Sequence, residues 1–121
     1  MTQIYSVPIP RNFTDVDDRF TSIFLGAPDF KLLNSIGCSY LITLDMMMDS
    51  LRQGITNVAK RTKRPAAILL FQQCLSEVDL VHEMYRHGKI EEARLKIQEV
   101  QQLFLRAGKK MREPVNKIEG C

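Results

Sequence analysis

The side chains that could support acid–base or metal chemistry are few and poorly spaced for it. His82 and His87 are five residues apart, so on a helix they would point in different directions rather than toward a shared ligand. Asp45 and Asp49 share one helical face, but two carboxylates without a histidine or further acids are typical of a solvated surface. No Cys-x-x-Cys pair and no paired Asp/His spacing occurs in the chain. We therefore expect a protein that is not an enzyme and that binds no metal and no cofactor.

Basic residues form two clusters that are far apart in the sequence. One cluster, KRTKR, precedes Pro65, and the other occupies residues 106–112. If the helices that carry them are antiparallel, the clusters meet at one end of the fold. This predicted basic end consists of Lys60, Arg61, Lys63, Arg64, Arg106, Lys109, Lys110 and Arg112. Two interpretations stay open: ordinary cationic capping of helix carboxyl termini, or an anion site for nucleic acid or anionic lipid.

The overall charge does not by itself indicate a polyanionic partner. The 121 residues include 17 Lys and Arg and 14 Asp and Glu, with both signs spread along the chain and a net charge of only +3. An apolar content of 45% is enough to fill one core, so a single folded domain is expected. Local clustering of charge therefore carries more information than the total.

Apolar residues recur at helical spacing in three segments. We place the predicted helices at residues 32–62, 65–87 and 89–112. The first has a seven-residue rhythm between Leu33 and Val58. Pro65 suits the first turn of the second helix, Gly88 suits the left-handed residue that follows it, and Pro114 ends the third. The fold class is therefore predicted to be all-α.

The second and third predicted helices should fold back on each other as an antiparallel hairpin. Each is about 23 residues long, or roughly 35 Å, and only a few residues join them. The seven-residue rhythm favours coiled-coil-like packing with crossing angles of about 20°. With the first helix in the groove of this hairpin, the predicted architecture is an antiparallel three-helix bundle over residues 32–113.

The turn of this hairpin resembles that of known helical families. The residues that carry the resemblance are Tyr85, Gly88, Ile90, Glu92 and Ala93. They resemble the turn between paired helices in tetratricopeptide repeats and in MIT (microtubule-interacting and trafficking) domains, where the glycine lets the chain turn and the alanine allows close helix approach. The pattern occurs once, so a solenoid of repeats is not expected. Because KIEEARLKIQEVQQLFLRAGKK is similar to an MIT second helix, residues 81–110 are interpreted as MIT-like, with a third helix from residues 33–62.

The two ends of the chain differ in composition from the predicted bundle. Residues 1–31 contain three prolines and several phenylalanines among acidic residues, so we expect an extended arm with one short helix over residues 15–25. Two interpretations of this arm stay open. Its aromatic side chains pack on the bundle as a fourth element, or the arm is a binding segment that folds on a partner. Residues 114–121 are expected to form a C-terminal tail.

Six apolar residues are not needed by the predicted core stripes. Each lies about 200° around its helix from a member of the stripe, hence on the far side. Single exposed leucines are common, but six on three helices suggest that the arm, a second copy of the chain or a partner helix covers them. This predicted apolar face consists of Ile42, Met46, Leu69, Leu80, Leu95 and Leu105.

The cysteines and the apolar runs indicate an intracellular protein. Cys38, Cys74 and Cys121 cannot all pair, and their positions form no disulfide framework. The amino terminus lacks an apolar stretch of signal-peptide length, and the longest apolar run, AAILLF, is far shorter than a membrane span. We expect a soluble cytoplasmic protein, or a nuclear one given the loose localisation pattern KRTK, without a transmembrane segment.

These observations favour a non-enzymatic helical module that binds another protein. As an adaptor or scaffold it would recognise a partner helix or a linear motif, with apolar anchors for affinity and charged rims for orientation. One rival is a module whose basic end binds nucleic acid or anionic lipid. Another is a small helical chaperone for a secreted or assembling subunit, which would use the same apolar surface as an adaptor.

Overall fold

The computed structural model describes residues 7–35 and 41–112. This part of the chain is all-α, as predicted, and contains no strand. Its helices are α1 (Phe13–Gly26), α2 (Lys31–Ser35), α3 (Leu44–Ala59), α4 (Pro65–Arg86) and α5 (Ile90–Arg112). The predicted tail at residues 114–121 lies outside the described residues.

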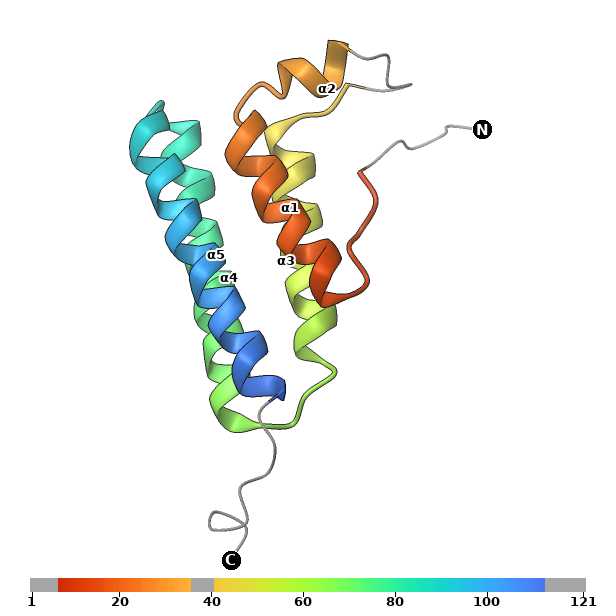
Figure 1. The fold of residues 1–121 in the computed structure, drawn as a ribbon. Helices are drawn as coiled ribbons and strands as arrows, with labels where there is room; N and C mark the ends of the chain where they lie inside the picture. Colours follow the sequence, from red (N-terminus) through yellow and green to blue (C-terminus); the bar gives the residue numbers. More distant parts are fainter. Residues whose placement is uncertain (1–6, 36–40, 113–121) are drawn as a thin grey trace, which may run out of the picture.

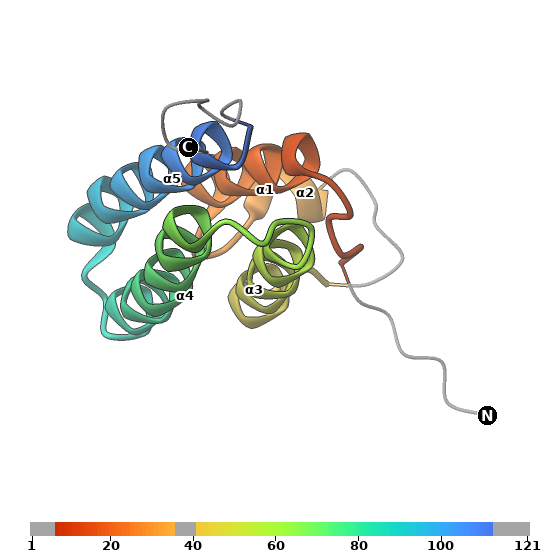
Figure 2. The same cartoon turned by 90° about the horizontal axis from the view of Figure 1, so that it is seen from below.

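The four longer helices form an antiparallel bundle (Figures 1 and 2). The chain runs along α1, α3, α4 and α5 in alternating directions, and the short α2 sits at the end where α1 stops and α3 starts (Figure 1). In the view along the bundle, α1 lies beside α3 and α5, and α4 completes the square beside the same two helices (Figure 2). The sequence predicted three bundle helices and an N-terminal arm, whereas the bundle contains four helices.

The missing helix is α1, which the sequence analysis had assigned to the arm. Asn12 caps it, because the Asn12 Oδ1 accepts a hydrogen bond from the Asp15 N–H at 2.9 Å. Val16, Phe20 and Ile23 then follow at spacings of four and three, and all three are buried. The short helix expected over residues 15–25 is thus present in a slightly longer form, and its aromatic side chains pack as a fourth element of the core.

The first predicted helix, over residues 32–62, is not continuous, because residues 32–35 belong to α2 and residues 41–43 are not helical. α3 begins only at Leu44, where the Thr43 Oγ1 accepts a hydrogen bond from the Met46 N–H at 3.3 Å. Just before it, the Asn34 amide binds both main-chain groups of Ile42, accepting from the N–H at 2.7 Å and donating to the carbonyl at 3.0 Å. This pairing holds the chain out of a helix ahead of Thr43. Residues 36–40, which belonged to the predicted helix, lie outside the described residues.

The predicted antiparallel hairpin is formed by α4 and α5. Pro65 occupies the first turn of α4, as expected. At the other end Gly88 has a φ of +78°, the left-handed conformation that favours glycine. The Gly88 N–H donates to the Tyr85 carbonyl at 3.1 Å and the Lys89 N–H donates to the Met84 carbonyl at 2.9 Å. These two bonds are the pair that defines a Schellman cap, so α4 ends sharply and α5 turns back at once.

An aromatic cluster around Phe104 of α5 joins three helices in the core. Its ring centroid lies 4.4 Å from that of Phe13 and 5.4 Å from that of Phe20, both on α1. Phe71 of α4 also packs near this ring, with the centroids 5.7 Å apart. The stacking of Phe13 depends on Gly108, since a Cβ at that position would collide with the Phe13 ring. The N-terminal helix is therefore an integral part of the core.

A strap of residues 7–10 closes the seam between α1 and α3. Its Pro8 carbonyl accepts a hydrogen bond from the Ser50 Oγ of α3 at 2.8 Å. Pro10 is buried over Gly54, where an added Cβ would lie 2.9 Å from the Pro10 Cβ. The small residue in α3 is thus what lets the strap lie directly on the helix.

Candidate functional site

The two basic clusters converge at one end of the bundle. α3 ends and α4 begins there, and α5 ends beside them (Figure 1). The Arg64 Nη1 donates a hydrogen bond to the Lys110 carbonyl at 3.3 Å, which joins the two clusters directly. The Arg61 guanidinium donates to the Arg11 carbonyl, so Arg11, which the sequence analysis did not assign, lies at the same end. The members of this basic end are Lys60, Arg61, Lys63, Arg64, Arg106, Lys109, Lys110 and Arg112, all exposed except the half-buried Arg64.

Most cations of the basic end form no ion pair with a carboxylate of the described ranges. Within residues 7–35 and 41–112, no ion pair joins a carboxylate to Lys60, Arg61, Lys63, Arg64, Arg106, Lys109 or Arg112. The negative ends of the α3 and α5 dipoles lie here and offset part of the charge. Although the net charge of the chain is only +3, the surface at the basic end is therefore strongly positive.

The turn of residues 60–64 presents half of these cations. Within it, the Thr62 Oγ1 accepts a hydrogen bond from the Arg64 N–H at 3.2 Å, just ahead of α4. On the α5 side, the Arg112 guanidinium lies 5.0 Å from the centroid of the Phe13 ring, a cation–π contact that positions the last turn of the helix. The arrangement can donate many charge-assisted hydrogen bonds to phosphate oxygens.

Three residues of the predicted apolar face are exposed. Leu69 is 65% exposed and Leu80 is 47% exposed on α4, while Leu95 of α5 is 64% exposed. Leu69 and Leu80 are eleven residues apart, close to three full turns, so they share the outer side of α4. The exposed residues therefore lie on two helices, two on α4 and one on α5, rather than forming a face that spans three helices.

The other three residues are covered by the fold itself. Ile42 is only 8% exposed, so its assignment to an exposed face was wrong. The reason is that it precedes α3 and is held against the bundle by the bonds to Asn34 described above. Met46 is half-buried and packs against the core, and Leu105 is half-buried.

A polar network that the sequence analysis missed joins α3 to α4. His82 is only 4% exposed, with its Nε2 2.6 Å from the Asp45 Oδ1 and its Nδ1 2.5 Å from the Arg52 Nη2. A guanidinium only donates, so the Nδ1 accepts and the ring takes the tautomer that donates from Nε2 to Asp45. Arg86 also donates to the Asp45 Oδ1, at 3.0 Å. Both ring nitrogens are therefore occupied by structural bonds.

The same network holds the second carboxylate of the Asp45 and Asp49 pair. Arg52 forms ion pairs with Asp49 at 2.8 Å and with Asp79 of α4 at 2.6 Å. The sequence contained a signal for this network. The polar residues at 45, 49 and 52, and likewise those at 79, 82 and 86, are three or four residues apart, so each set lies on one face of its helix. The charged side chains and the histidine of this network therefore hold α3 and α4 together.

Burial and hydrogen bonding shift the pKa of several groups, among them Asp45, Cys74 and Tyr85. The hydrogen bonds from His82 and then from Arg86 lower the pKa of Asp45 below its usual 3.8. Desolvation raises the pKa of the Cys74 thiol to about 12 and that of the Tyr85 hydroxyl to about 12. Cys74 is therefore a protonated core thiol at neutral pH, unlike a nucleophilic cysteine.

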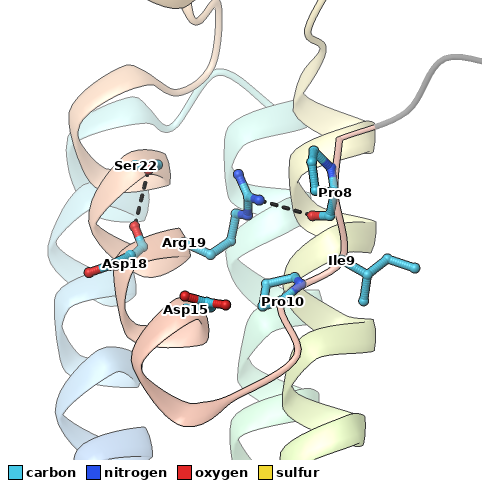
Figure 3. A pocket seen from close by; sticks show the side chains of 7 residues that line it. All are labelled: Pro8, Ile9, Pro10, Asp15, Asp18, Arg19 and Ser22. Carbon is cyan, nitrogen blue, oxygen red and sulfur yellow. Dashed lines mark hydrogen bonds between the residues drawn. The ribbon is translucent and has the colours of Figure 1, made fainter.

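A polar pocket of about 350 Å³ opens between the strap and α1 (Figure 3). Asp15 and Asp18 project from α1 in this view, and the Arg19 Nη2 reaches across to donate to the Pro8 carbonyl at 2.9 Å (Figure 3). The lining residues are Pro8, Ile9, Pro10, Asp15, Asp18, Arg19 and Ser22. The lining lacks a histidine or cysteine beside the carboxylates, so it offers no base paired with an activated nucleophile.

Metal, membrane and family signals do not add a further site. The described ranges contain no group of three or more His, Cys, Asp or Glu residues placed to hold a metal ion. Among the described helices, none is both long and apolar enough to cross a membrane. Comparison with known protein families, with curated proteins and with solved structures gave no match to this chain. The MIT-like resemblance of residues 81–110 therefore stays a prediction.

Proposed function

We propose that this protein is a non-enzymatic helical interaction module whose basic end binds a phosphate-bearing polyanion, either nucleic acid or anionic lipid. The observation that supports this proposal is the convergence of two basic clusters, joined by the bond from Arg64 to Lys110, without carboxylate partners for most of the cations in the described ranges. A cytoplasmic or nuclear location is part of the proposal. The apolar contacts that the sequence favoured as a binding surface have weaker support, because half of them are covered.

Binding at such a site would be driven mainly by the release of counterions. Each phosphate that a Lys or Arg neutralises frees condensed cations, so affinity falls as salt rises, with a log–log slope of about −0.9 per phosphate on duplex DNA. Base stacking has no support, because the Phe and Tyr side chains of the described ranges are buried or half-buried. The proposed recognition is therefore of backbone or headgroup phosphates, without readout of bases.

A pair of charge reversals tests this proposal against a matched control. Lys63→Glu with Lys109→Glu alters two exposed cations of the basic end, whereas Lys31→Glu with Lys89→Glu makes the same change in net charge at the opposite end. Fluorescence anisotropy would measure binding to a short DNA duplex, and co-sedimentation would measure binding to vesicles rich in phosphatidylserine. At about 0.1 M salt, the loss of two phosphate contacts lowers duplex affinity roughly 60-fold.

The control should lose about threefold or less, since its cations lie beyond a Debye length of about 10 Å from the bound polyanion. Equal losses in both variants would mean that only net charge matters and would contradict a localised site. Binding to vesicles alone would restrict the proposal to lipid. Binding to neither probe at about 50 mM salt would remove it.

The outer side of α4 supports a second candidate, recognition of a partner protein's helix or linear motif. Leu69 and Leu80 lie on one line, and a pocket of about 310 Å³ adjoins Leu80. That pocket is lined by Leu80, Glu83, Met84, His87 and Lys89. Apolar anchors within a charged rim suit an adaptor, a scaffold or a chaperone that holds a subunit's helix. Leu80→Asp should abolish such binding and leave the helical circular dichroism unchanged, because this side chain is substantially exposed.

A further inference from the structure

Thr62 is the one hydroxyl-bearing residue of the turn that builds the basic end. It stands between two dibasic pairs, Lys60 with Arg61 and Lys63 with Arg64. Its Oγ1 accepts a hydrogen bond from the Arg64 N–H at 3.2 Å, and Arg64 is the residue that immediately precedes α4. Any anionic group attached to this oxygen would be held among the cations of the basic end.

The surroundings of this oxygen would stabilise a covalently attached phosphate. Such a phosphate carries about −1.5 to −2 charges at pH 7 and three strong acceptor oxygens. Four cationic side chains lie within two residues of Thr62, and the first turn of α4 contains no acidic residue that would repel the group. The Arg64 N–H precedes a helix whose positive dipole end also favours negative charge.

The turn can open without disturbing the core. None of the side chains of residues 60–64 is buried. Opening would break the bonds from the Arg61 N–H to the Val58 carbonyl, 3.0 Å, and from the Thr62 N–H to the Ala59 carbonyl, 3.3 Å. It would also release the surface bonds from the Arg61 guanidinium to the Arg11 carbonyl and from the Arg64 guanidinium to the Lys110 carbonyl. The segment is therefore able to enter an enzyme cleft that binds an extended chain, and its cations would be attracted by a cleft lined with carboxylates.

We propose that Thr62 is a phosphorylation site and that its phosphate occupies the basic end, displacing the polyanion. This inference rests on the proposed function for its regulatory part. A protein kinase with an acidic substrate cleft would transfer the γ-phosphoryl group of ATP. The bond from Thr62 Oγ1 to the γ-phosphorus forms, the bond from that phosphorus to the β–γ bridging oxygen breaks, ADP leaves, and the hydroxyl proton passes to a carboxylate base of the kinase.

The expected effect follows from the charge that the phosphate neutralises. About two cations become unavailable to an external polyanion, which reduces the log–log salt slope on duplex DNA by about 1.8. At about 0.1 M salt this corresponds to a loss of affinity of roughly 60-fold. The internal pairing should also raise the melting temperature at low salt, and this increase should shrink as salt screens it.

The experiment uses the full chain and a panel of purified Ser/Thr kinases that prefer basic substrates, with ATP. Peptide mass spectrometry locates the phosphate, anisotropy with a short DNA duplex measures binding, and melting curves at two salt concentrations measure the internal pairing. Thr62→Val, which keeps the shape and lacks the oxygen, is the control. Phosphate on Thr62, a salt-sensitive rise in melting temperature and the loss of duplex affinity support the proposal, provided that the variant shows none of them.

Two results overturn it: no phosphate on Thr62 with any kinase of the panel, or a phosphate that changes neither the melting temperature nor the affinity. Failure of the proposed function is distinguishable. If the unmodified chain binds neither DNA nor anionic vesicles while phosphorylation of Thr62 raises the melting temperature, the polyanion proposal fails and the phosphate site at the basic end is supported.

Discussion

Replacing Phe20 by alanine tests whether α1 is a structural helix of the bundle. Phe20 is fully buried, and its ring centroid lies 5.4 Å from that of Phe104. Truncation of a buried phenylalanine removes its transfer free energy and leaves a cavity, together about 3–5 kcal/mol. A domain of this size has a free energy of unfolding of about 5–15 kcal/mol, so the variant should lose a large fraction of it. At about 4 °C per kcal/mol, its melting temperature should fall by roughly 12–20 °C.

The matched control lies on the same helix. Leu25 is 73% exposed, so Leu25→Ala should change the free energy of unfolding by no more than about 0.5 kcal/mol. Urea titration followed by circular dichroism at 222 nm measures both variants with the same unfolding reaction. If Phe20→Ala unfolds at the same urea concentration as Leu25→Ala, α1 contributes nothing to the core and the four-helix description is refuted.

Three further predictions concern the core and its titrating groups. Ala93 is fully buried on α5, so Ala93→Leu should overpack the bundle and cost about 1–3 kcal/mol in urea titration; an unchanged midpoint would place Ala93 off the seam. Because the folded state lowers the pKa of Asp45 below 3.8, its contribution to stability is present above that pH and lost as the pH falls further. Asp45→Asn should therefore flatten the decline in stability in acid, and parallel curves would contradict this role. Cys74, buried with a pKa of about 12, should resist iodoacetamide at pH 8 until the chain unfolds, as measured by peptide mapping; rapid labelling of the native protein would contradict its burial.

The parts of the fold that the sequence predicted well are those with strong local signals. Pro65 and Gly88 each suit one position at a helix end, so they indicated where α4 begins and where the chain turns into α5. Once the hairpin was expected, antiparallel geometry was enough to bring the two basic clusters to one end. The hydrogen bond from Arg64 to the Lys110 carbonyl joins the two clusters at that end.

The parts that were wrong depend on competition between local signals. The prolines of the first 31 residues suggested an arm, although Asn12 and the spacing of Val16, Phe20 and Ile23 already marked a helix. In the first predicted helix, the seven-residue rhythm outweighed the capping signal of Thr43. The burial of Ile42 could not be read from periodicity, because it results from a side-chain bond eight residues away along the chain.

Salt titration of duplex binding by the full chain tests the central claim most directly. A log–log plot of affinity against salt between about 50 and 200 mM should be linear, with a slope of about −0.9 for each phosphate engaged. If four or more cations of the basic end take part, the slope should be about −3.6 or steeper, and Lys63→Glu with Lys109→Glu should make it shallower by about 1.8. The Lys31→Glu, Lys89→Glu control should keep the slope of the unmodified chain. A slope near zero, or the same slope in the chain and both variants, would contradict a polyanion site at the basic end.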